Sequence, residues 1–216
     1  MRVPKITEER REAVRNRLVD AAVTLMHTAG PAEVTTRAIL EQAGLSAGAL
    51  YHYFASKDEL FEAVAQRYVD DDPALRASPD TDAAGLGAWH VAVLASLFGR
   101  DAHSILPQLR LAAATNEPVR ASLDRYDQAL IERGGALNRQ SQEAGLFVAD
   151  LDAEALAELV EIFYEGFVLR DRLDAFGTSR GRVVALFFEL LGARALDPTS
   201  PEAAAVRRAL EELAHS

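Results

Sequence analysis

Residues 35–60 read TTRAILEQAGLSAGALYHYFASKDEL, and the capping and turn residues in this stretch are the clearest indication of local structure in the chain. Thr35 is placed to cap a short helix that ends at Gln42 or Ala43, with Gly44 closing it. Ser46 is placed to cap a second helix that reaches Tyr53 or Phe54. Two short helices joined by a glycine-bearing turn are typical of a helix-turn-helix, although a simple packing corner has the same periodicity.

The second of these helices is expected to have two unlike faces. On a helical wheel of about 100° per residue, Leu50 and Phe54 fall on one side and face the preceding helices. The opposite side carries two positions with little or no side chain beside a tyrosine and a histidine, in the order Ala47, Gly48, Tyr51 and His52. We expect this side to approach another molecule closely.

The rest of the chain also has helical periodicity. Ser56 with Glu59 forms a capping box that opens the next helix, and Asp152 and Ser200 are expected to be N-caps. Pro107 is expected to kink or interrupt its helix. The pattern predicts an all-α fold of about ten helices, over residues 8–29, 35–43, 46–54, 56–69, 83–98, 105–114, 118–144, 153–173, 180–196 and 201–214.

Composition narrows the class of protein. The 216 residues include no cysteine, which excludes disulfides and thiolate metal sites, and no segment predicts a secretion signal or a membrane span, so we expect a cytoplasmic protein. The net charge is −10, but residues 1–70 hold 9 Lys or Arg against 10 Asp or Glu. The N-terminal segment is therefore nearly neutral and compatible with a nucleic-acid partner.

Residues 12–65 closely resemble the DNA-binding domain of the TetR family of bacterial transcriptional regulators. The resemblance rests on TTRAI at 35–39, AGLSAGALYHYF at 43–54 and SKDEL at 56–60. It implies a helix-turn-helix over residues 35–54 in which the second helix lines the major groove. The DNA-contacting residues that it implies are Thr36, Arg37, Ser46, Ala47, Gly48, Tyr51, His52 and Lys57.

The resemblance also implies a division into two domains. Residues 1–70 would form the DNA-binding domain, and residues 71–216 a helical effector-binding and dimerisation domain. The effector candidates, each of which is also compatible with an ordinary core position, are Trp89, His90, His103, Phe163, Tyr164 and Phe167. The candidates for a homodimer interface are apolar positions of the last long helices, namely Leu156, Val160, Phe163, Val184, Phe187, Phe188 and Leu191.

The function implied is repression at a palindromic double-stranded DNA operator by a homodimer that a small-molecule effector releases. An apolar or cationic effector is favoured, because aromatic residues accompany an acidic domain. A ligand-independent dimeric DNA-binding regulator is one alternative, and a small helical enzyme is another. No catalytic, cofactor or metal-binding motif supports the enzyme: Gly85-Leu-Gly begins like a dinucleotide-binding loop but lacks the last glycine and a preceding strand.

Overall fold

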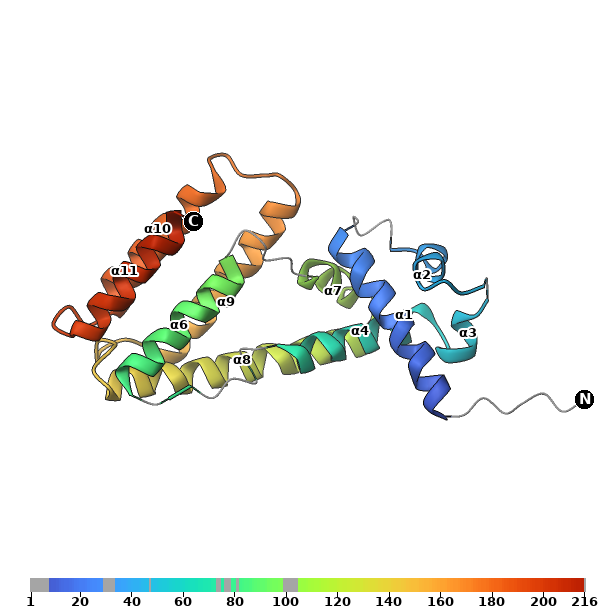
Figure 1. Ribbon diagram of the computed structural model, residues 1–216, viewed down its shortest axis with the longest axis horizontal. Helices are drawn as coiled ribbons and strands as arrows, with labels where there is room; N and C mark the ends of the chain where they lie inside the picture. Colours follow the sequence, from blue (N-terminus) through green and yellow to red (C-terminus); the bar gives the residue numbers. More distant parts are fainter. Residues whose placement is uncertain are drawn as a thin grey trace, which may run out of the picture. The chain divides into compact units, whose positions relative to one another are not determined.

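The computed structural model describes residues 8–28, 34–46, 48–72, 75, 79–80, 82–98 and 105–215. The predicted all-α fold is confirmed: the described residues contain ten helices and no strand, apart from one bridge between Phe147 and Leu196 (Figure 1). The helices are α1 (Glu8–Thr28), α2 (Thr36–Gln42), α3 (Leu50–Tyr53), α4 (Lys57–Asp71), α6 (Ala83–Phe98), α7 (Leu106–Ala113), α8 (Glu117–Glu143), α9 (Ala153–Arg172), α10 (Arg180–Ala195) and α11 (Pro201–His215). None of the described helices is long and apolar enough to cross a membrane.

The described residues fall into two compact units. The first unit contains residues 8–72 and 105–126, and the second contains residues 82–98 and 127–215. The first unit thus ends its N-terminal segment near the expected boundary at residue 70. It also includes α7 and the beginning of α8, which the sequence had assigned to the other domain.

In the first unit, α1 packs against α2, α3 and α4. The shared core is apolar and fully buried, with Leu18, Ala22, Met26, Ile39, Leu50, Phe54, Leu60 and Val64 at its centre. Helix α7 joins this core through a buried amide, because Gln108 Nε2 donates to the Met26 carbonyl at 2.8 Å. Asn116, which caps α8 by accepting from Val119 N, donates to the Asp58 carbonyl at 3.1 Å. These long-range bonds explain why α7 belongs to the first unit.

Most predicted helix caps are confirmed. Thr35 Oγ1 accepts from Ala38 N at 3.1 Å, and Ser56 Oγ accepts from Glu59 N at 3.1 Å. Asp152 and Ser200 accept from the backbone N–H three residues ahead in the same way. Each side chain satisfies a donor that the first turn of a helix leaves without a partner.

Two local predictions are wrong. Ser46 does not cap the third helix, because α3 begins at Leu50 with Ala49 as its N-cap and no side-chain cap bond. Gly48 has a φ of +88°, which a right-handed helix does not allow, so the chain enters α3 through a turn. Pro107 does not kink its helix either: it lies in the first turn of α7, where its missing N–H costs no hydrogen bond.

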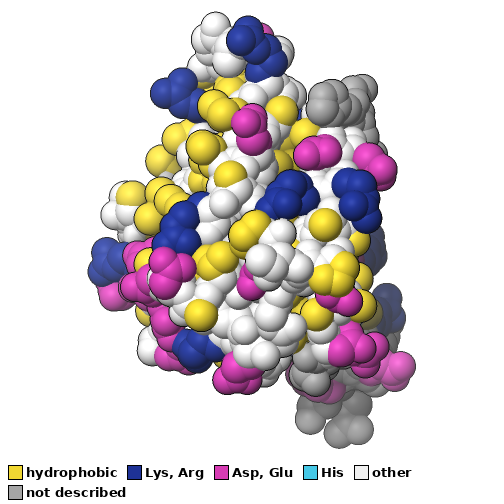
Figure 2. Space-filling model, turned by 90° about the vertical axis from the view of Figure 1, so that its left-hand side faces the viewer, with side chains coloured by type: hydrophobic (Ala, Val, Ile, Leu, Met, Phe, Trp, Pro, Cys, Tyr) yellow, Lys and Arg dark blue, Asp and Glu magenta, His cyan; other side chains and the backbone are white. Residues whose placement is uncertain are grey.

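In the second unit, α11 packs against both α10 and α6. At the α6–α11 contact Gly87 is buried, and a Cβ built on it would lie 2.7 Å from Val206 Cγ2. Figure 2 shows that apolar, basic and acidic side chains are intermixed on the face of this unit turned to the viewer. This face has no large area of one charge sign.

We predict that Gly87→Ala lowers the free energy of unfolding by ~1–3 kcal/mol, because the new methyl group overpacks the contact with Val206. Gly181→Ala is the control, since a Cβ there meets nothing within 4 Å, and it should leave stability unchanged or slightly raised. Urea unfolding at one protein concentration measures both. Equal stability of the two variants would contradict the close packing at Gly87.

Candidate functional site

The turn between α2 and α3 is fixed by a glycine and by an arginine from α1. Gly44, with φ +64°, donates its N–H to the Glu41 carbonyl, and Leu45 N donates to the Leu40 carbonyl at 2.9 Å. This pair of bonds is a Schellman motif, which satisfies the last carbonyls of α2. Arg17 Nη2 donates to the Ala43 carbonyl at 2.6 Å and adds a side-chain bond to the same helix end.

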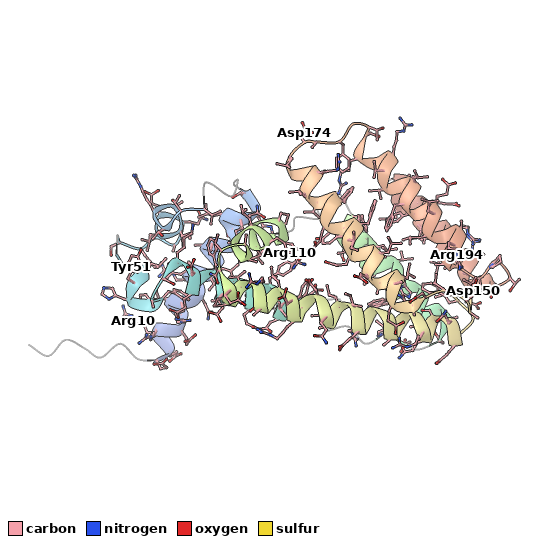
Figure 3. All side chains as sticks on the ribbon, turned by 180° about the vertical axis from the view of Figure 1, so that it is seen from behind. Arg10, Tyr51, Arg110, Asp150, Asp174 and Arg194 are labelled. Atoms are coloured by element: carbon pink, nitrogen blue, oxygen red, sulfur yellow. The ribbon has the colours of Figure 1, made fainter. Side chains whose placement is uncertain are left out.

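Helix α3 presents the two faces expected from its sequence. Leu50 and Phe54 are buried, with 0% and 1% exposure, whereas Tyr51 is 62% exposed and His52 is also exposed. Tyr51 projects from the outer side of α3 (Figure 3). The structure therefore holds a phenol and an imidazole on the solvent face of a short element, and both have hydrogen-bonding groups that can meet base edges or phosphates.

Small residues precede these rings. Gly48 is exposed, and a Cβ added to it would have no neighbour within 4 Å. Ser46 is exposed as well, and its carbonyl accepts from Ala49 N at 3.0 Å. Ala47 lies outside the described residues. The backbone at this end of α3 is open to close approach.

Cationic side chains flank the exposed face of α3 in the chain. Arg37 has a side chain that is 88% exposed, and it pairs with Glu41 at 2.8 Å. The hydrogen bond and charge of Glu41 raise the pKa of Arg37. Lys57 begins α4, and its Nζ lies 4.7 Å from the centre of the Phe61 ring. Thr36, the first residue of α2, is half-buried.

In the second unit, the effector candidates form two groups. Trp89 and His90 lie together on α6, with the His90 ring 5.0 Å from Trp89 and 4.7 Å from Phe147. Phe163, Tyr164 and Phe167 of α9 surround Phe98, also on α6, at centroid distances of 5.3–5.8 Å. His90 and Phe98 are separated by about 12 Å along α6 at ~1.5 Å per residue. His103 lies outside the described residues.

His90 is a neutral, hydrogen-bonded ring. Its Nε2 lies 3.0 Å from Ser141 Oγ, and Ser141 directs its hydroxyl hydrogen to the Leu137 carbonyl. With that hydrogen used, Ser141 accepts and His90 Nε2 donates. Desolvation by the surrounding side chains lowers the pKa of His90 to about 4. The adjacent Trp89 Nε1 is buried without a hydrogen-bond partner in the described part of the chain.

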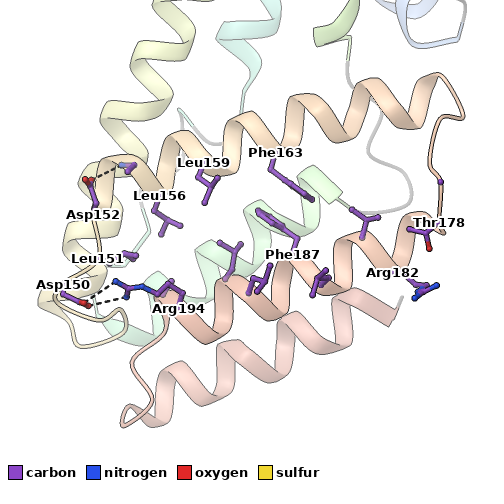
Figure 4. A pocket seen from close by; sticks show the side chains of 17 residues that line it. Asp150, Leu151, Asp152, Leu156, Leu159, Phe163, Thr178, Arg182, Phe187 and Arg194 are labelled. Atoms are coloured by element: carbon purple, nitrogen blue, oxygen red, sulfur yellow. Dashed lines mark hydrogen bonds and ion pairs between the residues drawn. The ribbon is translucent and has the colours of Figure 1, made fainter.

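An open groove of about 1160 Å³ lies between α9 and α10 (Figure 4). Its walls are mainly leucine, valine and phenylalanine, and Phe163 stacks on Phe187 across it at 3.8 Å. One end is polar, where Arg194 pairs with Asp150 at 3.2 Å, and Arg182 is among the lining residues nearer the other end. Such a groove exposes apolar surface that either a ligand or a second protein surface would cover.

The dimer candidates are unequally accessible. Val184, Phe187 and Phe188 are buried within their own chain, whereas Leu156, Val160, Phe163 and Leu191 are half-buried. Large exposed apolar side chains lie at adjacent positions, namely Leu159, Ile162 and Leu169 on α9, Leu173 at its C-cap, and Leu186 and Leu190 on α10. Of these, only Leu159 belongs to the apolar stripe predicted from the sequence.

The exposed positions of α9 have a recognisable spacing. Leu159, Ile162, Gly166, Leu169 and Leu173 follow one another at intervals of three and four residues. This is the heptad spacing of a seam between packed helices, with a glycine near its centre that permits close approach. The spacing is visible in the sequence, where the predicted apolar stripe includes Leu159 but otherwise follows Leu156, Val160 and Phe163 on the neighbouring face.

Comparison with known proteins relates the N-terminal part of the first unit to one protein family. Residues 18–64 match the family model described as bacterial regulatory proteins, tetR family. The HTH-type transcriptional repressor KstR2 of Rhodococcus jostii is 37% identical over 57 residues, which are 26% of this chain and 28% of that protein. The chain spans between 28% and 34% of the length of the curated relatives that it matches.

Solved structures extend the likeness to most of the chain. A TetR-family transcriptional regulator from Agrobacterium tumefaciens has a TM-score of 0.69 at 17% identity, covering 86% of this chain and 99% of that one. A transcriptional regulator from Saccharomonospora viridis, solved in complex with choline, has a TM-score of 0.66 at 18% identity, covering 86% and 98%. At these identities the likeness shows the fold.

We predict that the protein loses stability as the pH falls from 6.5 towards 4. In this window the unfolded state binds a proton at residue 90 and the folded state does not, because the folded pKa is about 4. The loss from this group should be about 2–3 kcal/mol, at ~1.4 kcal/mol per pKa unit. Urea unfolding at pH 7, 5.5 and 4 measures it.

His90→Gln should flatten this pH dependence, since the amide does not titrate, whereas His52→Gln should retain it because the His52 ring is already exposed. All three proteins are compared at one concentration, so that self-association affects them equally. If His90→Gln has the wild-type pH dependence, the desolvated neutral ring is not its cause.

Proposed function

The N-terminal domain of this chain belongs to the TetR family of bacterial regulatory proteins, and from this premise we propose that the protein is a sequence-specific DNA-binding transcriptional regulator. The observation that carries the proposal is the exposed face of α3, where Tyr51 and His52 stand beside the open backbone at Gly48. A repressor that a small molecule releases from its operator, acting in the cytoplasm, is the form of regulation we propose.

At the DNA we propose two kinds of contact. Lys57, Arg37, Thr36, Ser46 and Tyr51 hold the phosphate backbone, which supplies affinity without sequence information. His52 reads a base edge in the major groove, where an imidazole can donate or accept, and Ala47 and Gly48 admit the base pairs at close range. Arg37 meets a phosphate while sharing its charge with Glu41, so its contribution is smaller than that of an unpaired arginine.

The effector proposal rests on the second unit. Aromatic rings around Phe98, and a buried Trp89 N–H that has no partner among the described residues, favour a mainly apolar or cationic ligand that carries a hydrogen-bond acceptor. Choline, bound by the Saccharomonospora viridis regulator, is a cation of the type that aromatic rings hold. A regulator of the same fold that acts without any ligand is the alternative.

Selection of duplexes from a random pool tests DNA recognition and defines the operator. Recovery of a palindromic consensus supports the proposal, and recovery of no consensus overturns it. Candidate small molecules are then screened for release of the selected duplex. A phosphate ester acting as the tight-binding inducer would contradict the apolar or cationic class.

We predict that Lys57→Ala and His52→Ala have different effects. Lys57→Ala should weaken binding to all duplexes about equally and flatten the slope of log affinity against log salt by roughly 2, because a dimer loses two phosphate contacts at about 0.9 each. His52→Ala should cost ~1–3 kcal/mol per half-site on the selected duplex and little on random DNA.

A salt titration and a repeated selection measure both effects. If His52→Ala weakens random DNA as much as the selected duplex, and its selection profile is unchanged, His52 positions the protein and does not read a base.

We further propose that the protein is a homodimer whose interface combines the exposed seam of α9 with the groove beside α10. A partner copy would cover Leu159, Ile162, Leu169, Leu186 and Leu190, which are each about half exposed or more in the single chain. Helices packed at heptad spacing form a four-helix arrangement, and an obligate interface of this kind buries on the order of 2,000 Å² or more.

We predict that Ile162→Glu combined with Leu190→Glu converts a dimer into a monomer at micromolar concentration, because two charges per chain would be buried without partners. Light scattering measures the mass. Leu111→Glu is the matched control: Leu111 is 59% exposed and lies on α7, so the variant should remain a dimer. A monomeric wild-type protein would contradict the proposed interface.

A further inference from the structure

Helix α3 does not hold its own position. It has four residues and no side-chain cap at its N-terminus. A helix this short has almost no intrinsic stability, since the first turn costs more conformational entropy than its few hydrogen bonds return. The direction in which Tyr51 and His52 point is therefore set by the contacts that hold the other side and the end of α3.

One side chain of α1 makes three contacts at that end. Arg15 Nη1 donates to the carbonyl of Tyr53, the last residue of α3, and lies 3.4 Å from Glu59 Oε1. The guanidinium carbon also lies 4.1 Å from the centre of the Phe54 ring, in a cation–π arrangement. Planar stacking together with directed N–H bonds is a combination that arginine provides and lysine does not.

Glu59 completes the clamp from the side of α4. Its second carboxylate oxygen accepts from Ala55 N at 2.5 Å, while Ser56 Oγ accepts from Glu59 N. The last residue of α3, Tyr53, and the connection to α4, residues 54–56, thus each contact Arg15 or Glu59, which form one ion pair between α1 and α4. The side chain of Arg15 is 26% exposed and that of Glu59 is 38% exposed, so the pair is partly shielded from water.

The charge of Arg15 is already neutralised where it lies. Glu59 is one partner, and Glu12 of the same helix lies 3.9 Å from Arg15 Nε. A phosphate would have to displace these carboxylates and the Phe54 ring to reach the guanidinium. This arrangement is that of an internal support and not of a phosphate ligand.

We propose that Arg15 is a positioning residue for DNA readout, which fixes the orientation of α3 by holding the Tyr53 carbonyl and the Phe54 ring against Glu59. The inference rests on the proposed DNA-binding function and deepens it. Tyr53 directly follows His52, so a shift at this carbonyl moves the His52 ring relative to a base edge. The proposed phosphate contacts of α2 and of Lys57 at the start of α4 lie outside α3, and the one on α3, the Tyr51 hydroxyl, is uncharged, so the salt dependence of binding should be retained.

The variant is Arg15→Lys, which retains the charge but loses the stacked, forked geometry. Arg67→Lys is the matched control, because Arg67 also joins α4 to α1, bonding Asp20 at 3.2 Å and Asn16 at 3.0 Å, without contacting residues 53–56. Each protein is titrated with the duplex selected by the wild-type protein and with a scrambled duplex of the same composition. Salt dependence and thermal unfolding are measured in parallel.

Arg15→Lys should weaken binding to the selected duplex about tenfold or more, a loss like that of a mismatched base pair, and leave the scrambled duplex and the salt slope unchanged. Arg67→Lys should keep the wild-type preference for the selected duplex over the scrambled one, even if its unfolding temperature falls as much as that of Arg15→Lys. Equal weakening on both duplexes would overturn the proposal, since Arg15 would then supply affinity without sequence preference, as a phosphate ligand does.

A lower unfolding temperature with unchanged preference, measured well below that temperature, would also overturn it, since Arg15 would then contribute to stability alone. A wild-type protein that selects no duplex would contradict the proposed DNA-binding function itself. The two failures are thereby distinguishable.

Discussion

Burial of Leu50 and Phe54 against α1 is the contact on which the exposed face of α3 depends. Each of these side chains contributes roughly 1.5–3 kcal/mol when removed from water, and both are essentially inaccessible here. Helix α3 contains too few hydrogen bonds to form alone. Its exposed side, with Tyr51 and His52, is therefore positioned by the core beneath it, and any change in that core is transmitted to the residues proposed to contact DNA.

The second unit uses its apolar residues in a different way. One side of α9 turns Tyr164 and Phe167 inward around Phe98, while another side leaves Ile162 and Leu169 in solvent. A helix that is apolar on more than one side normally packs on more than one side. The inward rings belong to the fold of the single chain, and the exposed aliphatic seam is surface that a monomer would have no reason to retain.

The sequence predicted the helices well because their ends are chemically marked. Thr35, Ser56, Asp152 and Ser200 each have a side chain that accepts from the first turn, and Gly44 and Gly145 have the positive φ expected after a helix. Ser46 is also a residue type that favours the N-cap position, but it does not cap α3. The positive φ of Gly48, two residues later, is not helical, so the helix begins only at Leu50. Local capping rules do not tell whether an N-cap residue such as Ser46 or a nearby turn-forming glycine such as Gly48 determines where the helix begins.

Contacts between segments that are distant in the chain could not be predicted from the sequence. The bond from Gln108 to the Met26 carbonyl joins residues 82 positions apart, and nothing in the local pattern assigns α7 to the first unit. The same holds for Arg15, because its chain neighbours Val14 and Asn16 do not indicate that its side chain contacts Tyr53, Phe54 and Glu59. The exposed and inward sides of α9 were not separated in the predicted apolar stripe, because hydrophobicity does not tell whether an apolar residue is covered by its own chain or by another one.

Gly48 also bears on attempts to redirect the protein to a new DNA sequence. There is space for a side chain at Gly48, since no atom lies within 4 Å of an added Cβ. On volume alone, this position would be the first choice for mutagenesis. The obstacle is the backbone angle of +88°, which strains every residue with a Cβ by roughly 1 kcal/mol or more, asparagine and aspartate least. New base preferences are better sought by varying the exposed positions Tyr51 and His52 after the turn, while Gly48 is retained because its positive φ sets the direction in which the chain enters α3.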